Sequence, residues 1–209
     1  MYDAEVTESL LRSIEVTHKL KRLTLHRINV TSSPAVEFIN NLFKKAPNLW
    51  QLDMSYNPLL GAGVDSLIKH LSCAPHLEQL ELRGVKMTPQ QVMDLSSAIK
   101  QHRNITQLDS SYHVSFPILS QFVSLFFVYS LFKKAPNLVW LDMSGNPLLG
   151  AGVDSLIKHL SCAPHLKRLS LEGVKMTPQQ VMDLSSAFKQ PGNITYLGSS
   201  YHVSFPILS

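Results

Sequence analysis

The stretch "LWQLDMSYNPLLGAGVDSLIKHL", residues 49–71, decides the fold of this 209-residue chain. Its first half alternates apolar and polar residues, which predicts a strand with one buried face. Its second half spaces apolar residues at i, i+3, i+4 and i+7 from Val64 to Leu71, which predicts a helix with one apolar stripe. A strand and a helix this short cannot bury both apolar faces alone, so the stretch must pack against neighbours of its own kind.

Such neighbours are present along the whole chain. The pattern Leu-x-x-Leu-x-Leu, or a close variant, starts seven units, at Leu20, Leu49, Leu77, Ile105, Leu138, Leu166 and Ile194. The steps between the starts are 29, 28, 28, 33, 28 and 28 residues. We therefore predict a single α/β domain over residues 1–209, a solenoid of about seven units of 28–29 residues, with a parallel β-sheet inside its curve and helices outside.

A longer repeat overlies this short period. Residues 42–120 return as residues 131–209, with no gap and with 12 differences in 79 positions. In each copy, Thr88-Pro89-Gln90-Gln91 or its equivalent predicts a helix start, with threonine as N-cap, proline at the first position and glutamine three residues after the cap. "KKAPN" and "SCAPH" end the preceding helices with a proline.

The stretch at residues 52–71 resembles the leucine-rich repeat of the ribonuclease-inhibitor type. The residues that fall on its framework positions are Leu52, Met54, Asn57, Leu59, Gly63, Leu67 and Leu71. The fourth and seventh units depart from it, because Ser110 and Ser199 replace an apolar residue and His113 and His202 replace the asparagine. The resemblance implies a horseshoe fold with weaker packing at those two units.

The same resemblance limits what can be said about function. Arrays of this type occur in ribonuclease inhibitor, Ran GTPase activators, actin regulators and the sensor ends of NOD-like innate immune receptors. It implies a non-catalytic module that recognises a protein or peptide, and our first hypothesis is a sensor fragment of an intracellular NOD-like-receptor-type protein. The alternative is a regulator of a small GTPase or of actin assembly built on the same repeat.

Strand alternation predicts which residues face the concave surface. Counted from each unit start, the first, fourth, sixth and ninth residues point inward, and the third, fifth, seventh and eighth face the curve. The predicted ligand-binding residues on this face are Arg22, Gln51, Asp53, Tyr56, Gln79, Glu81, Arg83, Gln107, Asp109, Tyr112, Trp140, Asp142, Arg168, Glu172, Tyr196 and Tyr201. Tryptophan, tyrosine and arginine are enriched at binding hot spots.

The two long copies differ mainly on this face. Seven of the 12 differences fall on the 12 paired concave positions, and five fall on the other 67. Helix residues expected to be exposed are identical in both copies: Asp65, Lys69, His70, Gln90, Gln91, Asp94, Lys100 and Gln101. Free drift would change these as well, so the comparison favours diversification for recognition over relaxed constraint.

Composition and motifs argue against several classes of function. The net charge of +4 comes without a dense basic run, so no nucleic-acid partner is expected. No GxxxxGK[ST] loop is present, and no catalytic triad or carboxylate pair can be assigned, so no enzyme activity and no cofactor are expected. Histidine and cysteine recur at His70, Cys73 and His76, but Cys73 occupies a helix end that is usually buried in this repeat and no fourth ligand is evident, so no metal is expected.

Cysteine usage predicts a cytoplasmic location. The chain has two cysteines, Cys73 and Cys162, at equivalent positions of the two copies, and no signal peptide is recognised. About 14 Å or more should separate them, too far for a disulfide. Three Asn-x-Thr sequons, at Asn29, Asn104 and Asn193, would matter only in a secreted protein.

Residues 114–130 form an irregular junction between the copies. The run Val114–Phe132 has 19 residues and no charge. Three interpretations stay open: the outer helix of the 33-residue unit, a membrane span, or translated non-coding sequence. A membrane span fits the length but would split a solenoid whose register resumes at Leu138, so no membrane partner is expected.

Overall fold

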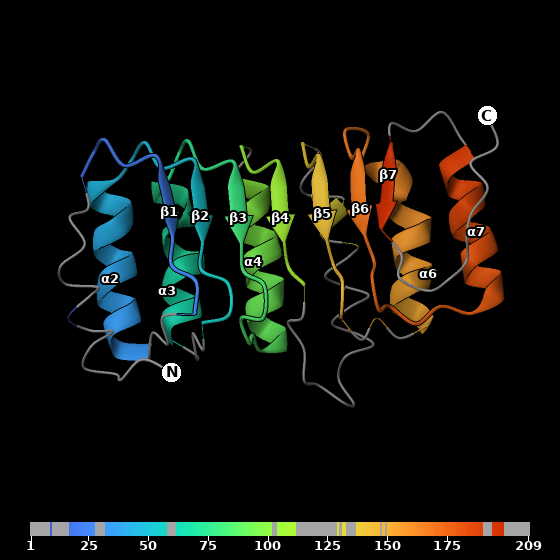
Figure 1. Ribbon diagram of the computed structural model, residues 1–209, viewed down its shortest axis with the longest axis horizontal. Helices are drawn as coiled ribbons and strands as arrows, with labels where there is room; N and C mark the ends of the chain where they lie inside the picture. Colours follow the sequence, from blue (N-terminus) through green and yellow to red (C-terminus); the bar gives the residue numbers. More distant parts are fainter. Residues whose placement is uncertain are drawn as a thin grey trace.

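In a computed structural model the chain forms a seven-stranded parallel sheet with helices along one side (Figure 1). The structure describes residues 9, 17–27, 32–57, 62–101, 104–111, 129, 131–132, 137–146, 148, 150–189 and 194–198. The elements are β1 (Arg22–Thr24), α2 (Ser32–Lys45), β2 (Gln51–Asp53), α3 (Ala62–His70), η1 (Leu71–Cys73), β3 (Gln79–Glu81), α4 (Pro89–Gln101), β4 (Gln107–Asp109), β5 (Trp140–Asp142), α6 (Gly150–His159), η2 (Leu160–Cys162), β6 (Arg168–Ser170), α7 (Pro178–Lys189) and β7 (Tyr196–Gly198).

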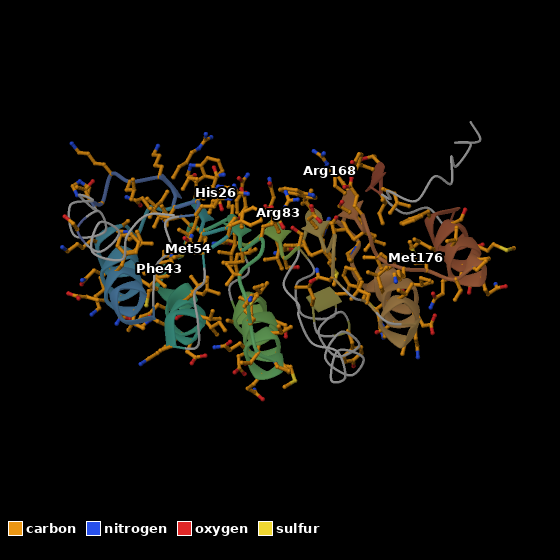
Figure 2. The ribbon with its side chains drawn as sticks, turned by 60° about the horizontal axis from the view of Figure 1, so that its bottom comes forward. His26, Phe43, Met54, Arg83, Arg168 and Met176 are labelled. Atoms are coloured by element: carbon orange, nitrogen blue, oxygen red, sulfur yellow. The ribbon has the colours of Figure 1, made fainter. Side chains whose placement is uncertain are left out.

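The strands lie side by side in chain order from β1 to β7, and every neighbouring pair is parallel. The helices lie on the outside of a shallow arc and the strands on its inside (Figure 2). Figure 2 also shows His26, Arg83 and Arg168 on the strand side, and Phe43 and Met54 below them, toward the helices. The predicted α/β leucine-rich solenoid, with an inner parallel sheet and outer helices, is confirmed.

The core is a ladder of leucines between the two layers. Each strand begins two residues after a unit start, and its middle residue is a leucine that pairs in register with the next. In β1 to β6 these leucines are buried: Leu23, Leu52, Leu80, Leu108, Leu141 and Leu169. The sixth position of the fourth unit is Ser110, which is also buried and donates a hydrogen bond from Oγ to the Asp142 carbonyl (3.2 Å). A hydroxyl is therefore tolerated there because the next unit supplies its acceptor.

Buried asparagines join successive units after the strands. The Asn57 side chain is fully buried, and its Nδ2 donates to the carbonyls of Leu25 in the preceding unit and Met54 (2.8 Å) in its own. Asn146 repeats this bond pattern with Ser110 (2.8 Å) and Met143 (2.9 Å). One amide thus satisfies carbonyls from two units where the strand ends, which explains why the repeat uses asparagine at this position.

The predicted helix start at Thr88 forms a reciprocal capping box. The Gln91 amide donates to Thr88 Oγ1 (3.2 Å), and the Thr88 amide donates to Gln91 Oε1 (2.9 Å). Thr177 and Gln180 repeat both bonds in the second copy, at 3.2 and 3.0 Å. The proline in the first turn of α4 lacks an N–H at a point where a helix has no use for one.

The cysteines are exposed, which corrects the sequence-based expectation of a buried helix end. Both lie in short 3-10 turns, η1 and η2, that follow α3 and α6. The tighter turn buries Leu71 and Ala74 and turns Cys73 between them toward solvent. Cys162 lies in the same place in the second copy.

Most of the junction at residues 114–130 lies outside the described residues. Leu131 and Phe132, which directly follow the junction, are helical and buried, as Leu42 and Phe43 are in the first copy. Tyr129 is helical, and its ring centroid lies 4.8 Å from that of His159 in an edge-to-face contact.

Candidate functional site

The open face of the sheet carries two parallel rows of side chains. Because the middle residue of each strand points to the core, the first and third residues point to the opposite face. The register aligns the first residues as the upstream row: Arg22, Gln51, Gln79, Gln107, Trp140, Arg168 and Tyr196. It aligns the third residues as the downstream row: Thr24, Asp53, Glu81, Asp109, Asp142, Ser170 and Gly198.

Four consecutive members of the downstream row are carboxylates, and we call them the acidic row: Asp53, Glu81, Asp109 and Asp142. Neighbouring strands lie about 4.8 Å apart, so the acidic row is about 14 Å long. Its charges lie in a line across β2 to β5, and each one faces another carboxylate on at least one side.

Burial and mutual repulsion act on the middle of the acidic row. Burial raises the pKa of the Glu81 carboxyl, and the adjacent Asp53 raises it further, while a hydrogen bond from Gln51 Nε2 (3.2 Å) lowers it. Burial and the charge of Asp53 both disfavour the ionised form of Glu81.

Asp109 is the most enclosed member of the acidic row, with 7% of its surface exposed. Burial raises the pKa of its carboxyl, Asp142 raises it further, and hydrogen bonds from Ser111 lower it. Both of those bonds, from the Ser111 amide (2.9 Å) and hydroxyl (2.7 Å), fall on Oδ1. Asp109 Oδ2 therefore accepts no hydrogen bond from another residue that the structure describes.

The Tyr56 ring is the centre of a cation–aromatic group at the downstream edge of β1 to β3, which we call the Tyr56 cluster. Arg27 Cζ lies 4.9 Å and Arg83 Cζ 5.6 Å from the ring centroid, and the His26 ring meets it edge to face at 5.0 Å. The ring lies over Gly84, where an added Cβ would come within 2.9 Å of Tyr56 Cδ1. Glycine at this position makes room for the ring.

Two residues of the Tyr56 cluster hold a strained backbone. In the five units whose eighth position the structure describes, this position has a positive φ, and glycine occupies it in Gly84 (67°), Gly145 (65°) and Gly173 (73°). Arg27 (56°) and Tyr56 (58°) adopt the same conformation with a full side chain. A left-handed conformation costs a non-glycine residue roughly 1–2 kcal/mol, and such strain gathers at functional sites.

A second cation–aromatic group lies at the upstream edge of β5 to β7. Arg168 Cζ lies 5.9 Å from the Trp140 ring centroid and 5.0 Å from that of Tyr196, so three neighbouring strands each supply one member. We call it the Trp140–Tyr196 stack. Arg168 is exposed, and 44% of the Tyr196 surface is exposed. An added Cβ at Gly198 would lie 3.3 Å from Tyr196 Cε1, so a small residue there leaves space for the ring.

All seven concave differences between the long copies fall within these three features. Three glutamines of the upstream row become the Trp140–Tyr196 stack: Gln51/Trp140, Gln79/Arg168 and Gln107/Tyr196. Two changes remove the Tyr56 cluster from the second copy: Tyr56/Gly145 and Arg83/Glu172. The last two changes are Glu81/Ser170 and Asp109/Gly198. They replace carboxylates with uncharged residues, so the acidic row stops at β5. The changed side chains therefore fall in three groups of neighbouring residues.

The structure places one further difference at the same face. Trp50, which differs from Val139, was not predicted to be concave, yet the Arg22 guanidinium lies 4.3 Å above its ring. Trp50 precedes β2 by one residue and reaches the upstream row from its edge. Strand alternation alone could not indicate this contact.

The seventh position corrects the predicted concave pattern, because its serines are buried. Ser55 Oγ accepts a hydrogen bond from the Arg83 amide (3.2 Å), and Ser144 Oγ accepts one from the Glu172 amide (3.1 Å). These serines join successive units. Glu172, at the seventh position of its unit, is exposed, whereas Tyr112 and Tyr201 lie outside the described residues.

The convex control set needs two corrections. His70, expected to be exposed, is half-buried, and its Nδ1 lies 2.9 Å from the Ser66 carbonyl oxygen. Gln91, expected to be exposed, is buried, and its Nε2 donates to Asp65 Oδ1 (2.8 Å) on the neighbouring helix. The capping box and this contact explain why Gln91 is identical in both copies. Lys69, Gln90 and Asp94 are exposed as expected. They still serve as unchanged solvent-facing residues.

The described residues contain neither a metal-ligand cluster nor a membrane-spanning helix. No group of three or more histidine, cysteine or acidic residues among them is arranged to hold a metal ion. In the same part of the chain, no helix has both the length and the apolar character needed to cross a membrane.

Known proteins with related architecture were also found. The family model described as Leucine Rich Repeat matches residues 137–160. The chain is similar to the tropomodulin C-terminal domain of Caenorhabditis elegans, with 11% identity and a TM-score of 0.49 over 97% of this chain and 86% of that one. It is also similar to the leucine-rich repeat-containing protein LegL7 from Legionella pneumophila, with 14% identity and a TM-score of 0.34 over 94% of this chain and 88% of that one. Neither structural likeness bears on function.

Proposed function

Because the chain is a leucine-rich repeat protein, we propose that it is a non-catalytic module that binds a protein or peptide on the concave face of its sheet. One observation carries the proposal: all seven concave differences between the copies fall within three groups of mutually neighbouring side chains. Exposed Arg168 and Tyr196, together with half-buried Trp140, supply the residue types that are enriched at binding hot spots.

The face also has the dimensions of a polypeptide site. Seven strands about 4.8 Å apart span roughly 30 Å between the outer strands. A surface of this length accommodates an extended peptide or a folded partner better than it does a small metabolite.

We further propose that the module is a sensor fragment of an intracellular NOD-like-receptor-type protein and that it acts in the cytoplasm. The support is the resemblance of the repeat together with the altered concave side chains, since a sensor gains new ligands by changing this face while its framework stays fixed. Sequencing more genomic copies of the 79-residue block tests this finer proposal. Differences spread evenly over both faces would remove its basis.

Selection of peptides from a random display library on the intact chain tests the general proposal. Trp140→Ala and Arg168→Ala should each weaken the selected peptides at least ten-fold, because alanine removes part of the Trp140–Tyr196 stack. Lys158→Ala, at an exposed position of α6, is the matched control and should leave the affinity unchanged. Equal losses in all three variants would refute a concave site.

A further inference from the structure

The three features of the open face lie on one diagonal. The Tyr56 cluster is at the downstream edge of β1 to β3, and the Trp140–Tyr196 stack is at the upstream edge of β5 to β7. The acidic row runs across β2 to β5 between these two groups. A ligand that touches all three must therefore cross the strands obliquely.

The length of the diagonal fits a short extended peptide. Four strand steps of about 4.8 Å separate β2 from β6, which gives about 19 Å. Arg168 and Tyr56 are about five residues apart along the chain direction, but Tyr56 lies in the turn after β2, so this offset adds at most about 16 Å at right angles. The diagonal is therefore between about 19 and 25 Å long, the span of about seven to nine residues of extended chain.

The charges along the diagonal alternate in sign. Exposed Arg27 carries positive charge at one end and exposed Arg168 at the other, while the charge of half-buried Arg83 lowers the pKa of the Asp109 carboxyl. The aromatic rings contact the guanidinium faces, and a stacked guanidinium can still bind a carboxylate through its planar edge. Each end is therefore complementary to an acidic group.

The middle of the diagonal is complementary to basic side chains. Four carboxylates stand in line, and Glu81 and Asp109 are held partly out of water. Asp109 Oδ1 accepts both hydrogen bonds from Ser111, and Oδ2 accepts none from the residues that the structure describes. A line of charges about 14 Å long matches the side chains of a crossing polypeptide better than it matches a single cation. The same line repels a polyanion.

We propose that the face binds one extended segment of a partner protein, about nine residues long, whose basic middle lies over the acidic row and whose acidic ends lie at the Tyr56 cluster and the Trp140–Tyr196 stack. The proposal rests on the concave-face function above and names the chemistry of its partner. The strained backbone of Arg27 and Tyr56 supports it independently, because these residues hold side chains where the other described units have glycine.

A nine-residue synthetic peptide tests the pattern. It carries an acidic residue at each end and lysines at the third, fifth and seventh positions, with serines between them, so that all charged side chains lie on one face of an extended chain. Its control has the same composition, with the lysines at the ends and the acids in the middle. Fluorescence anisotropy with the full 209-residue chain should show at least ten-fold tighter binding of the patterned peptide. Equal binding of the two peptides would overturn the proposal.

A second measurement tests whether an acidic end of the peptide lies at Arg168. Arg168→Gln places the first-copy residue at this position and should weaken the patterned peptide about five- to ten-fold. Two further peptides each lack one acidic end. The peptide that lacks the acid paired with Arg168 should be insensitive to the variant, and the other should stay sensitive. Equal sensitivity of both truncated peptides would refute the assigned ends.

The outcomes separate this inference from the broader function. If library-selected peptides depend on Trp140 and Arg168 but the patterned peptide binds no better than its control, the charge pattern is wrong and the concave site stands. If the chain self-associates, and Arg168→Gln abolishes the association without any preference for the patterned peptide, the face belongs to a second copy and the inference is also wrong.

Discussion

Removing one charge from the acidic row should stabilise the fold, and Glu81→Gln is the sharpest test. Glu81 faces Asp53 on one side and Asp109 on the other, in register on neighbouring strands. Like charges directly opposite each other in a sheet are destabilising, by a few tenths of a kcal/mol per pair. Glutamine keeps the size of the side chain and an oxygen for the hydrogen bond from Gln51.

The expected gain is about 0.5–1 kcal/mol at pH 7.5, the sum of two such pairs. For a chain of this length, that change raises Tm by about 1–4 °C. The gain should disappear in acid. Burial and Asp53 raise the pKa of the folded Glu81 carboxyl, so the native state holds the proton more tightly than the unfolded state does. Stability from this group is present below its unfolded pKa and is lost as the pH rises through the folded pKa.

Urea unfolding at pH 7.5 and at pH 4.0, followed by circular dichroism, measures both expectations. Glu172→Gln is the control on the same face, because the Glu172 side chain is exposed. The main-chain amide of Glu172 contacts Ser144, which is an uncharged residue of the neighbouring unit. The free energy of unfolding of this variant should change by less than about 0.3 kcal/mol, as expected for a surface substitution. If Glu81→Gln is no more stable than the wild type at pH 7.5, or gains equally at pH 4.0, the repulsion argument fails.

Four further outcomes follow from the contacts of single residues. Asn57→Ala should lower the free energy of unfolding by about 2–4 kcal/mol in urea, because it removes a buried donor from two main-chain carbonyls. Tyr56→Gly should be about 1 kcal/mol more stable than Tyr56→Ala, since only glycine relieves the positive φ. Gly84→Ala should lower Tm more than Gly173→Ala does, because both have a positive φ but only the first forces an added Cβ against the Tyr56 ring. Thr88→Ala should cost about 1 kcal/mol in the same urea assay through loss of the capping box.

The sheet could be predicted from the sequence because it depends only on which residues recur along the chain and at what spacing. A leucine at the fourth position of every unit fixes which strand face is buried, and the 28-residue period fixes the register with the next strand. The helix start at Thr88 could be predicted for the same reason, because the capping box is a contact between residues three apart.

The site could be predicted only as a face. Strand alternation predicts that Gln79 and Arg168 point to the open side of the sheet. It does not predict that Arg168 lies between two aromatic rings. Contacts of this kind depend on side-chain torsions and on residues 28 or more positions apart. The buried Ser55 and the exposed Cys73 were missed because a turn or a 3-10 segment follows the regular element and ends its periodicity.

The unchanged concave positions show what the fold requires of this face. Asp53 and Asp142 each accept the amide of the serine two residues later on Oδ1 at 2.8 Å, and both are retained. Asp109 accepts the equivalent amide from Ser111 (2.9 Å) but is replaced by Gly198, so this bond alone does not fix the residue. Ser55 and its counterpart are retained because they accept an amide from the next unit. Gly84 and its counterpart are retained at a positive φ.

Constraint from the fold alone does not explain the remaining pattern. It predicts that any exposed residue without a structural role changes at the same rate, whichever side it is on. Lys69 and Lys86 are exposed outside the concave face and are identical to their counterparts in the second copy. In the upstream row all three paired positions differ, and in the second copy Arg168 contacts the rings of both Trp140 and Tyr196. Independent drift has no reason to produce a stack across three strands, whereas selection for a new ligand does.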